Sequence, residues 1–224
     1  MVAIAKDAPQ AEAAATATRV LEDMDLDWQS LIAVVKPELE TEGLAGASDL
    51  FRRLGLDEEG LFDDVAPLVQ TYAEERAADL VGMHRREDGT FVPSAEPGIA
   101  ITDSTRNMLH STVTQAISEG WTAAQIQTAI MQNQGFSPAR ALNIARTETH
   151  TARMQGSLIA AKASTVVKKK RWELGHEGAC DICEGNAEQG AIGLEENFAS
   201  GDACPGAHPG CMCTLGYDLD ESPA

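Results

Sequence analysis

All five cysteines of the 224-residue chain lie within 34 residues near its C-terminus, and their spacing is that of metal ligands. Cys180 and Cys183 form a C-x2-C pair, and His208 and Cys211 form an H-x2-C pair after a loop of 24 residues. Each pair places two soft ligands on one tight turn, which is the usual arrangement in a tetrahedral zinc site. We therefore predict a structural Zn²⁺ ion bound by these four residues.

The other two cysteines have more than one interpretation. Cys213 follows a ligand by two residues and is expected to begin a strand, while Cys204 is expected to be a spare thiol in the loop. A disulfide cluster is the main alternative, but the number of cysteines is odd and the N-terminus does not resemble an export signal. An iron–sulfur centre is the third interpretation, and the histidine of the set argues against it.

The composition of the C-terminal segment supports a structural metal. Residues 172–224 contain nine glycines and no long apolar run. Such a segment cannot bury enough apolar surface to offset the entropy lost on ordering. A bound zinc ion contributes on the order of 10 kcal/mol, which is enough to replace a hydrophobic core.

Charge is distributed in three blocks that sum to −18. Residues 1–99 carry −13, residues 100–171 carry +6, and residues 172–224 carry −11 without any Lys or Arg. The acidic ends repel a phosphate backbone, and only 4% of residues are aromatic, so neither DNA binding by the whole chain nor a stacking platform is expected. The basic run 168–171 is expected to be solvated and to pair with the acidic flanks, with nucleic-acid contact as the alternative.

Apolar periodicity predicts a mainly α fold with a small C-terminal α+β zinc region, at about residues 172–218, that contains short antiparallel strands. No apolar run is long enough for a membrane span, so no membrane partner is expected. Pro and Gly in residues 86–101 predict a linker, which separates an acidic helical region, residues 1–99, from a second domain, residues 100–224. We expect helices over residues 11–24, 27–39, 48–54, 62–81, 103–119, 122–134 and 138–163, and strands over residues 165–174 and 212–217. Asp27 and Ser137 are expected to cap helix starts, Thr122 and Gln125 to form a capping box, and Gly55 and Gly120 to end helices.

Glu148 is the one acidic residue in the apolar stripe of the last helix. An ionised carboxylate there needs a partner, for example Arg106 or backbone N–H groups of the zinc region, so we predict a buried structural tether. A catalytic carboxylate near His150 is the alternative, although residues two apart on a helix point in different directions. His150 is expected to be an ordinary surface histidine. The stripe consists of Ala141, Ala145, Ala152 and Ile159.

Four blocks of the sequence, taken together, resemble the phage head morphogenesis proteins, which are minor head proteins similar to phage Mu protein F. They are Ala-Arg-Thr-Glu-Thr-His-Thr-Ala at 145–152, Lys-Arg-Trp at 170–172, the Cys180–Cys183 pair, and His-Pro-Gly-Cys-Met-Cys at 208–213. The resemblance covers about residues 100–218. It implies a structural motif at Arg146, Thr147, Glu148 and Trp172, and it places the family's zinc positions on the four predicted ligands. This chain has Gly210 and Met212 where the family usually has Asn and Arg.

The resemblance implies a role in capsid assembly. Such proteins associate with the portal vertex, are packaged in few copies, and in some phages influence DNA entry or ejection. The expected partners are portal, capsid or scaffold proteins and packaged DNA, and the expected locations are the virion and, during assembly, the host cytoplasm. The competing hypotheses are a zinc-dependent enzyme, such as a nuclease or toxin-like domain, and a zinc-ribbon module that binds nucleic acid.

Overall fold

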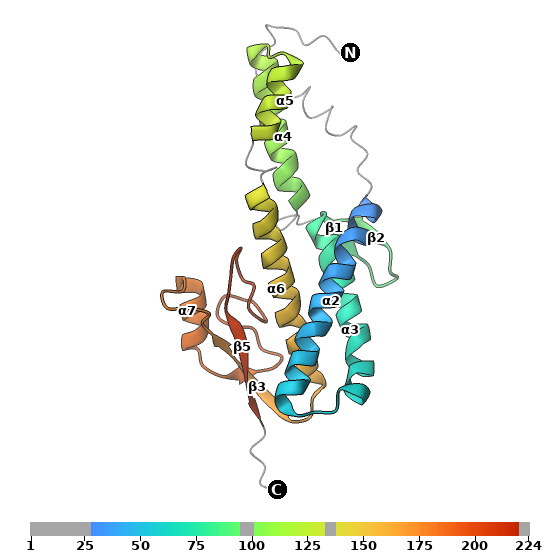
Figure 1. Ribbon diagram of the computed structural model, residues 1–224, viewed down its shortest axis with the longest axis vertical. Helices are drawn as coiled ribbons and strands as arrows, with labels where there is room; N and C mark the ends of the chain where they lie inside the picture. The colour runs from blue at the N-terminus through green and yellow to red at the C-terminus, as the bar shows by residue number, and fades with distance from the viewer. Residues whose placement is uncertain (1–27, 95–100, 133–137, 220–224) are drawn as a thin grey trace. The chain divides into compact units, whose positions relative to one another are not determined.

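The computed structural model of the protein describes residues 28–94, 101–132 and 138–219. It confirms the predicted fold class, mainly α with short antiparallel strands in the C-terminal region (Figure 1). The helix expected at 11–24 and the caps expected at Asp27 and Ser137 lie outside the described residues. The elements are α2 (Trp28–Leu54), α3 (Glu58–Leu80), β1 (Met83–Arg85), β2 (Phe91–Pro93), α4 (Ile101–Glu119), α5 (Ala123–Gln132), α6 (Pro138–Ala163), β3 (Val167–Glu173), α7 (Asp181–Glu188), β4 (Ile192–Gly193) and β5 (Thr214–Leu219).

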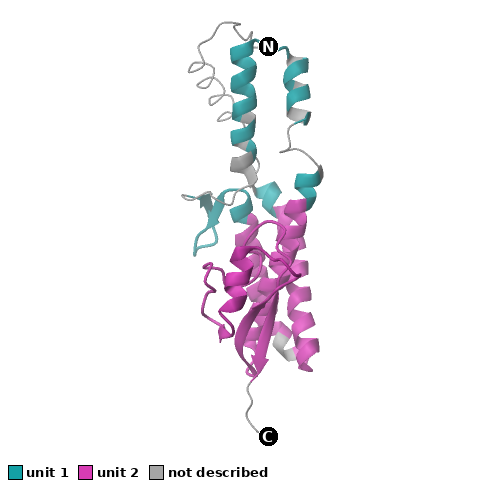
Figure 2. Ribbon diagram, turned by 90° about the vertical axis from the view of Figure 1, so that its left-hand side faces the viewer, with its two compact units in different colours: residues 1–32, 78–142 teal, residues 33–77, 143–224 magenta. Residues whose placement is uncertain are grey.

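The chain divides into two compact units, each built from segments that are distant in the sequence (Figure 2). The first unit comprises residues 1–32 and 78–142, and the second comprises residues 33–77 and 143–224. Residues 33–77, which we expected to belong to a separate N-terminal domain, are therefore in the same unit as the cysteine-rich segment. None of the helices in the described parts of the chain has the length and apolar character to cross a bilayer.

The first unit contains a hairpin and two helices. β1 and β2 pair antiparallel, and Gly89 supplies the turn with a φ of 82°. The turn and β2 lie in the stretch where we predicted only a linker. α4 and α5 are separated at Gly120, as predicted, and Thr122 and Gln125 form the predicted capping box. The Thr122 backbone N–H donates to the Gln125 side chain at 2.8 Å, and the Gln125 N–H donates to Thr122 Oγ1 at 3.3 Å.

In the second unit, α2 is one continuous helix that ends before Gly55, so our prediction of a separate helix starting at Ser48 was wrong. Ser48 lies inside α2 and donates a side-chain hydrogen bond to Glu58 at 3.0 Å instead of capping a new helix. Gly43 and Gly46 lie within α2, at the place where it approaches α6. Tertiary packing thus overrides their weak helix propensity.

Glycines allow α2 and α6 to pack backbone against backbone. A Cβ added to Gly156 would collide with the carbonyl group of Gly43, and one added to Gly46 would collide with the carbonyl group of Arg153. Arg153 also reaches across this contact, because its guanidinium donates to Glu42 and Asp49 at 2.9 Å each. The hydrogen bond from Arg153 lowers the pKa of Asp49, and partial burial, which raises it, offsets only part of this effect.

The C-terminal sheet has the strand order β4-β3-β5, with every pair antiparallel. Its two longer strands, β3 and β5, confirm the two strands predicted from the sequence, whereas β4 has two residues and was not predicted. α7 and the loop residues 194–213 lie between β3 and β5 in the sequence. The sheet thus brings both ends of the cysteine-rich segment together.

Lys170 corrects our expectation of a fully solvated basic run. Lys170 is 1% exposed, because its side chain is on the same inward face of β3 as that of Trp172. Its ammonium donates to the backbone carbonyls of Leu194 at 3.0 Å and Ala203 at 2.9 Å and lies 5.4 Å from the centre of the Phe198 ring. Burial lowers the pKa of Lys170. The side chain thereby fixes the long loop to the sheet, while Arg171 pairs with Asp218 as expected for an exposed residue of the run.

Two hydrophobic clusters meet α6 within this unit. One joins Leu158 to Trp172 and the buried cysteines, and the other joins Ala160 and Ala161 to α2 and α3. In the second cluster Phe51, Val65 and Val69 are fully buried. α6 therefore contributes to both clusters.

Substitution of Gly156 by Ala is expected to lower the free energy of unfolding by about 1–3 kcal/mol, because a backbone shift must accommodate the new methyl group. Gly185→Ala in α7 is the matched control, since nothing lies within 4 Å of its added Cβ. The control should be neutral or stabilising by about 0.5–1 kcal/mol. Denaturant unfolding of both variants measures this, and equal stability of the two variants would show that the helices do not approach as described.

Candidate metal centre

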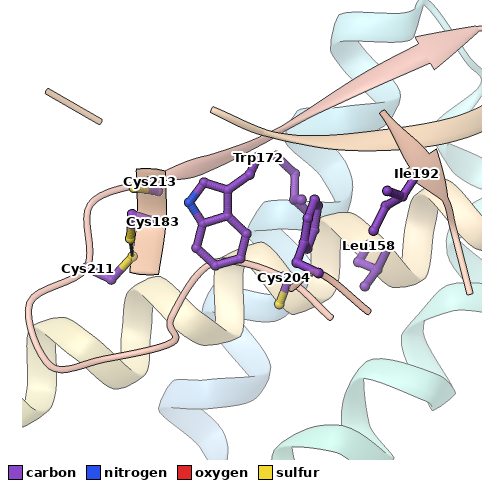
Figure 3. Packing of buried hydrophobic residues seen from close by; sticks show 9 residues of the cluster. Leu158, Trp172, Cys183, Ile192, Cys204, Cys211 and Cys213 are labelled. Atoms are coloured by element: carbon purple, nitrogen blue, oxygen red, sulfur yellow. Dashed lines mark hydrogen bonds between the residues drawn. The ribbon is translucent and has the colours of Figure 1, made fainter. Parts of the chain in front are cut away.

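The predicted ligand side chains converge in the second unit. The ligand atoms of Cys180, Cys183 and His208 lie within 4.8 Å of one another, and a second group of Cys183, Cys211 and Cys213 satisfies the same limit. His208 Nε2 lies 3.2 Å from Cys180 Sγ and 3.3 Å from Cys183 Sγ. Cys183 belongs to both groups, and Figure 3 shows it beside Cys211 and Cys213.

The separations fit a shared cation and not a disulfide. Cys183 Sγ and Cys211 Sγ are 3.8 Å apart, and all five cysteines are free. Two sulfurs bound to one tetrahedral zinc at about 2.3 Å are themselves about 3.8 Å apart, whereas a disulfide bond is about 2.0 Å long. Burial and the neighbouring cysteines raise the pKa of the Cys183 thiol. Ionised thiolates at this spacing therefore need a cation.

Local backbone structure explains how each ligand pair is presented. Cys180 lies immediately before α7 in extended conformation, and its carbonyl accepts a 2.9 Å hydrogen bond from the N–H of Glu184. Cys180 is therefore exposed at the helix start, and Cys183 is buried on the first turn.

The second pair lies on a turn in which the Cys211 N–H donates to the His208 carbonyl at 3.1 Å. His208 Nδ1 lies 3.1 Å from the Pro209 carbonyl oxygen, so Nδ1 carries the ring proton of the neutral imidazole. The lone pair of Nε2 is then available to coordinate a metal. Gly210 has a φ of 76°, a conformation that Gly and Asn tolerate best, which accounts for Gly in the position of the usual Asn. Met212, in the position of the usual Arg, is 62% exposed.

The two cysteines that were not predicted as ligands, Cys204 and Cys213, have different surroundings in the structure. Cys204 is buried away from both groups, its thiol donates to Gln155 Oε1 at 3.1 Å, and burial raises its pKa to about 12. Cys213 precedes β5 as expected, but its sulfur joins Cys183 and Cys211, which the sequence analysis missed. The C-x-C spacing was the available signal, because side chains two apart in extended backbone face the same side.

The Thr-Glu-Thr-His stretch of α6 holds the second ligand pair in place. Thr147 Oγ1 accepts a hydrogen bond from the Gly210 N–H at 3.0 Å, and His150 Nε2 donates to the Cys213 carbonyl at 2.8 Å. Our expectation that His150 is an ordinary surface residue was therefore wrong, because the turn packs on the face of α6 that carries it. One turn further along α6, Thr151 lies against Gly206, whose φ is 123°.

Glu148 points to a different neighbour. Both of its carboxylate oxygens accept hydrogen bonds from Arg76 of α3, at 2.8 and 2.9 Å. The side chains of Glu148 and Arg76 are 13% and 18% exposed. The partner is thus an arginine, and it lies 72 residues earlier in the chain. The structure does not describe the side chain of Arg106, the partner suggested from the sequence. Arg146 is exposed.

Trp172 lies between the sulfur groups and the hydrophobic core. It is 3% exposed and packs edge-to-face on Phe198, with ring centres 5.1 Å apart. Figure 3 shows its indole nitrogen on the side of Cys183 and Cys213. Of the four motif residues, Thr147 and Trp172 therefore lie next to the candidate centre, whereas Glu148 ties α6 to α3.

Comparison with known families assigns this part of the chain. Residues 107–216 match the family model described as Phage Mu protein F like protein. This stretch is similar to the phage Mu protein F like family. The match confirms the resemblance to phage head morphogenesis proteins, and within this Mu F-like region it includes α6, the sheet and both ligand pairs. Comparison of the chain with curated proteins and with solved structures gave no significant match.

Replacement of Glu148 by Gln is expected to lower the free energy of unfolding by roughly 1.5–3 kcal/mol, since a bidentate, mostly buried charge pair is lost. A double-mutant cycle with Arg76→Met isolates the energy of the pair. Glu195→Gln is the control, because Glu195 pairs with Lys162 but is 78% exposed, so its loss should cost less than about 1 kcal/mol. A coupling energy near zero for Glu148 and Arg76 would contradict the tether.

Proposed function

We propose that the protein is a minor head protein of a tailed phage that acts at the portal vertex during head assembly. The match of residues 107–216 to the Mu F-like family carries this proposal. Its partners are the portal protein and capsid or scaffold proteins, and it influences DNA packaging or ejection. It resides in the virion, in the capsid interior or at the portal vertex, after assembly in the host cytoplasm.

The charge distribution supports protein partners over direct binding along DNA. The net charge is −18, and residues 172–224 contain no Lys or Arg. In the second unit several of the basic side chains are already paired, namely Arg153 with α2, Arg76 with Glu148 and Arg171 with Asp218. The protein therefore presents mostly acidic groups, which favour basic surfaces on its partners.

We also propose that a structural Zn²⁺ ion occupies the candidate centre, held by side chains among Cys180, Cys183, His208 and Cys211. The donor set supports zinc because thiolate sulfur and imidazole nitrogen are its preferred ligands. When bound, the ion would neutralise the crowded thiolates. The two groups together contain five donor atoms, namely that of Cys183 and four others within 4.8 Å of it. This is more than a tetrahedral ion needs, which supports a closed structural site over the open position that a zinc-dependent enzyme requires.

Purified particles of the encoding phage are expected to contain the protein in few copies, as measured by mass spectrometry of the virion. The Cys180→Ser variant should be missing from the particles, because the ligand pair that orders the cysteine-rich segment is broken. Cys204→Ser, which removes a buried thiol outside both ligand groups, should be incorporated normally. Absence of the wild-type chain from filled, infectious particles would contradict the proposed role.

Removal of metal is expected to unfold the cysteine-rich segment. Purified protein should contain about one zinc per chain, and chelation should abolish the near-ultraviolet circular dichroism of the buried Trp172 while leaving most helical signal. Re-addition of Zn²⁺ should restore the spectrum. A spectrum that survives exhaustive chelation, or cystines at these positions, would refute the zinc site.

A further inference from the structure

Cys213 lies in the candidate centre, although it was not among the predicted ligands. Its sulfur is within 4.8 Å of those of Cys183 and Cys211, and all three residues are buried. Cys183 is at the same time close to Cys180 and His208. Five donors therefore compete for four positions, and the surroundings of each sulfur must decide which are used.

Two N–H groups are directed at the sulfur of Cys213. The backbone N–H of Gly175 and the indole N–H of Trp172 face it, as Figure 3 shows for the indole. The Trp172 Nε1 atom is buried and completes no regular hydrogen bond with any described residue. A buried donor without an acceptor costs about 1–3 kcal/mol, and a thiolate is a much better acceptor than a thiol.

Cys204 provides the contrast within the same hydrophobic cluster. It is similarly buried, at 8% exposure against 4% for Cys213, but its thiol donates to an oxygen of Gln155. A thiol that donates its proton is neutral. The two buried cysteines therefore differ in the hydrogen bonds that reach the sulfur, not in burial.

We propose that Cys213 is a thiolate ligand of the bound metal, and that Trp172 and Gly175 stabilise it by donating N–H groups to its sulfur. This inference rests on the zinc site proposed above. Cys213 takes one of the four positions, the other three come from Cys180, Cys183, His208 and Cys211, and Cys183 is common to both ligand groups. Trp172 is a positioning residue whose otherwise unpaired N–H gains an acceptor when the metal ionises the sulfur.

The test compares full-length, reduced Cys213→Ser and Cys204→Ser proteins, using Co²⁺ as a spectroscopic probe and Zn²⁺ in competition with a chelator. Cys213→Ser should lose intensity in the thiolate-to-cobalt absorption and bind Zn²⁺ at least roughly tenfold more weakly. Cys204→Ser should match the wild type. Trp172→Phe should keep one metal per chain but shift the thiolate-to-cobalt band.

A measurement on the wild-type protein covers the case in which Cys213→Ser does not fold. With isotopically enriched cadmium bound, NMR should detect scalar coupling between the metal and the β-protons of Cys213. Absence of that coupling, or metal binding by Cys213→Ser equal to that of Cys204→Ser, overturns the inference and leaves the zinc proposal standing. A wild-type protein that binds no metal overturns both.

Discussion

The second compact unit depends on α6, because this helix presents different faces to two sets of partners. Thr147 hydrogen-bonds to the turn that carries His208 and Cys211, His150 donates to the carbonyl of Cys213, and Leu158 packs with Trp172. The neighbouring face meets α2 and α3 through Gly156, Glu148 and Arg153. A helix repeats every 3.6 residues, so one short stretch can serve both sides. Residues 33–77 and 143–219 thereby become one unit, although residues 78–142 between them belong to the first unit.

This arrangement gives a physical meaning to the sequence block shared with phage head morphogenesis proteins. Thr147 and Glu148 are adjacent but point to different partners, a glycine N–H of the ligand turn and an arginine of α3. Replacing either would loosen one of the two interfaces. The block is therefore a structural element that connects α3 to the candidate metal centre, which agrees with a role in assembly.

The sequence predicted what depends on local chemistry and spacing. Three confirmed features follow from residues within a few positions of one another. They are the strands β3 and β5, the capping box at Thr122 and the helix stop at Gly55. It did not predict contacts made across the fold. Arg76 as the partner of Glu148 and the burial of Lys170 require knowledge of which distant segments meet. Gly43 and Gly46 lie inside α2, where close packing against α6 offsets their weak helix propensity.

The most direct test of whether α6 unites α2 and α3 with the C-terminal sheet is hydrogen exchange of the zinc-loaded protein. Exchange is measured for each peptide across a series of denaturant concentrations. The account predicts that peptides from α2, α3, α6 and the β3–β5 pair lose protection at the same denaturant concentration, as one cooperative unit. Exposure of the sheet and the ligand turns at a clearly lower concentration, with α2, α3 and α6 still protected, would contradict it.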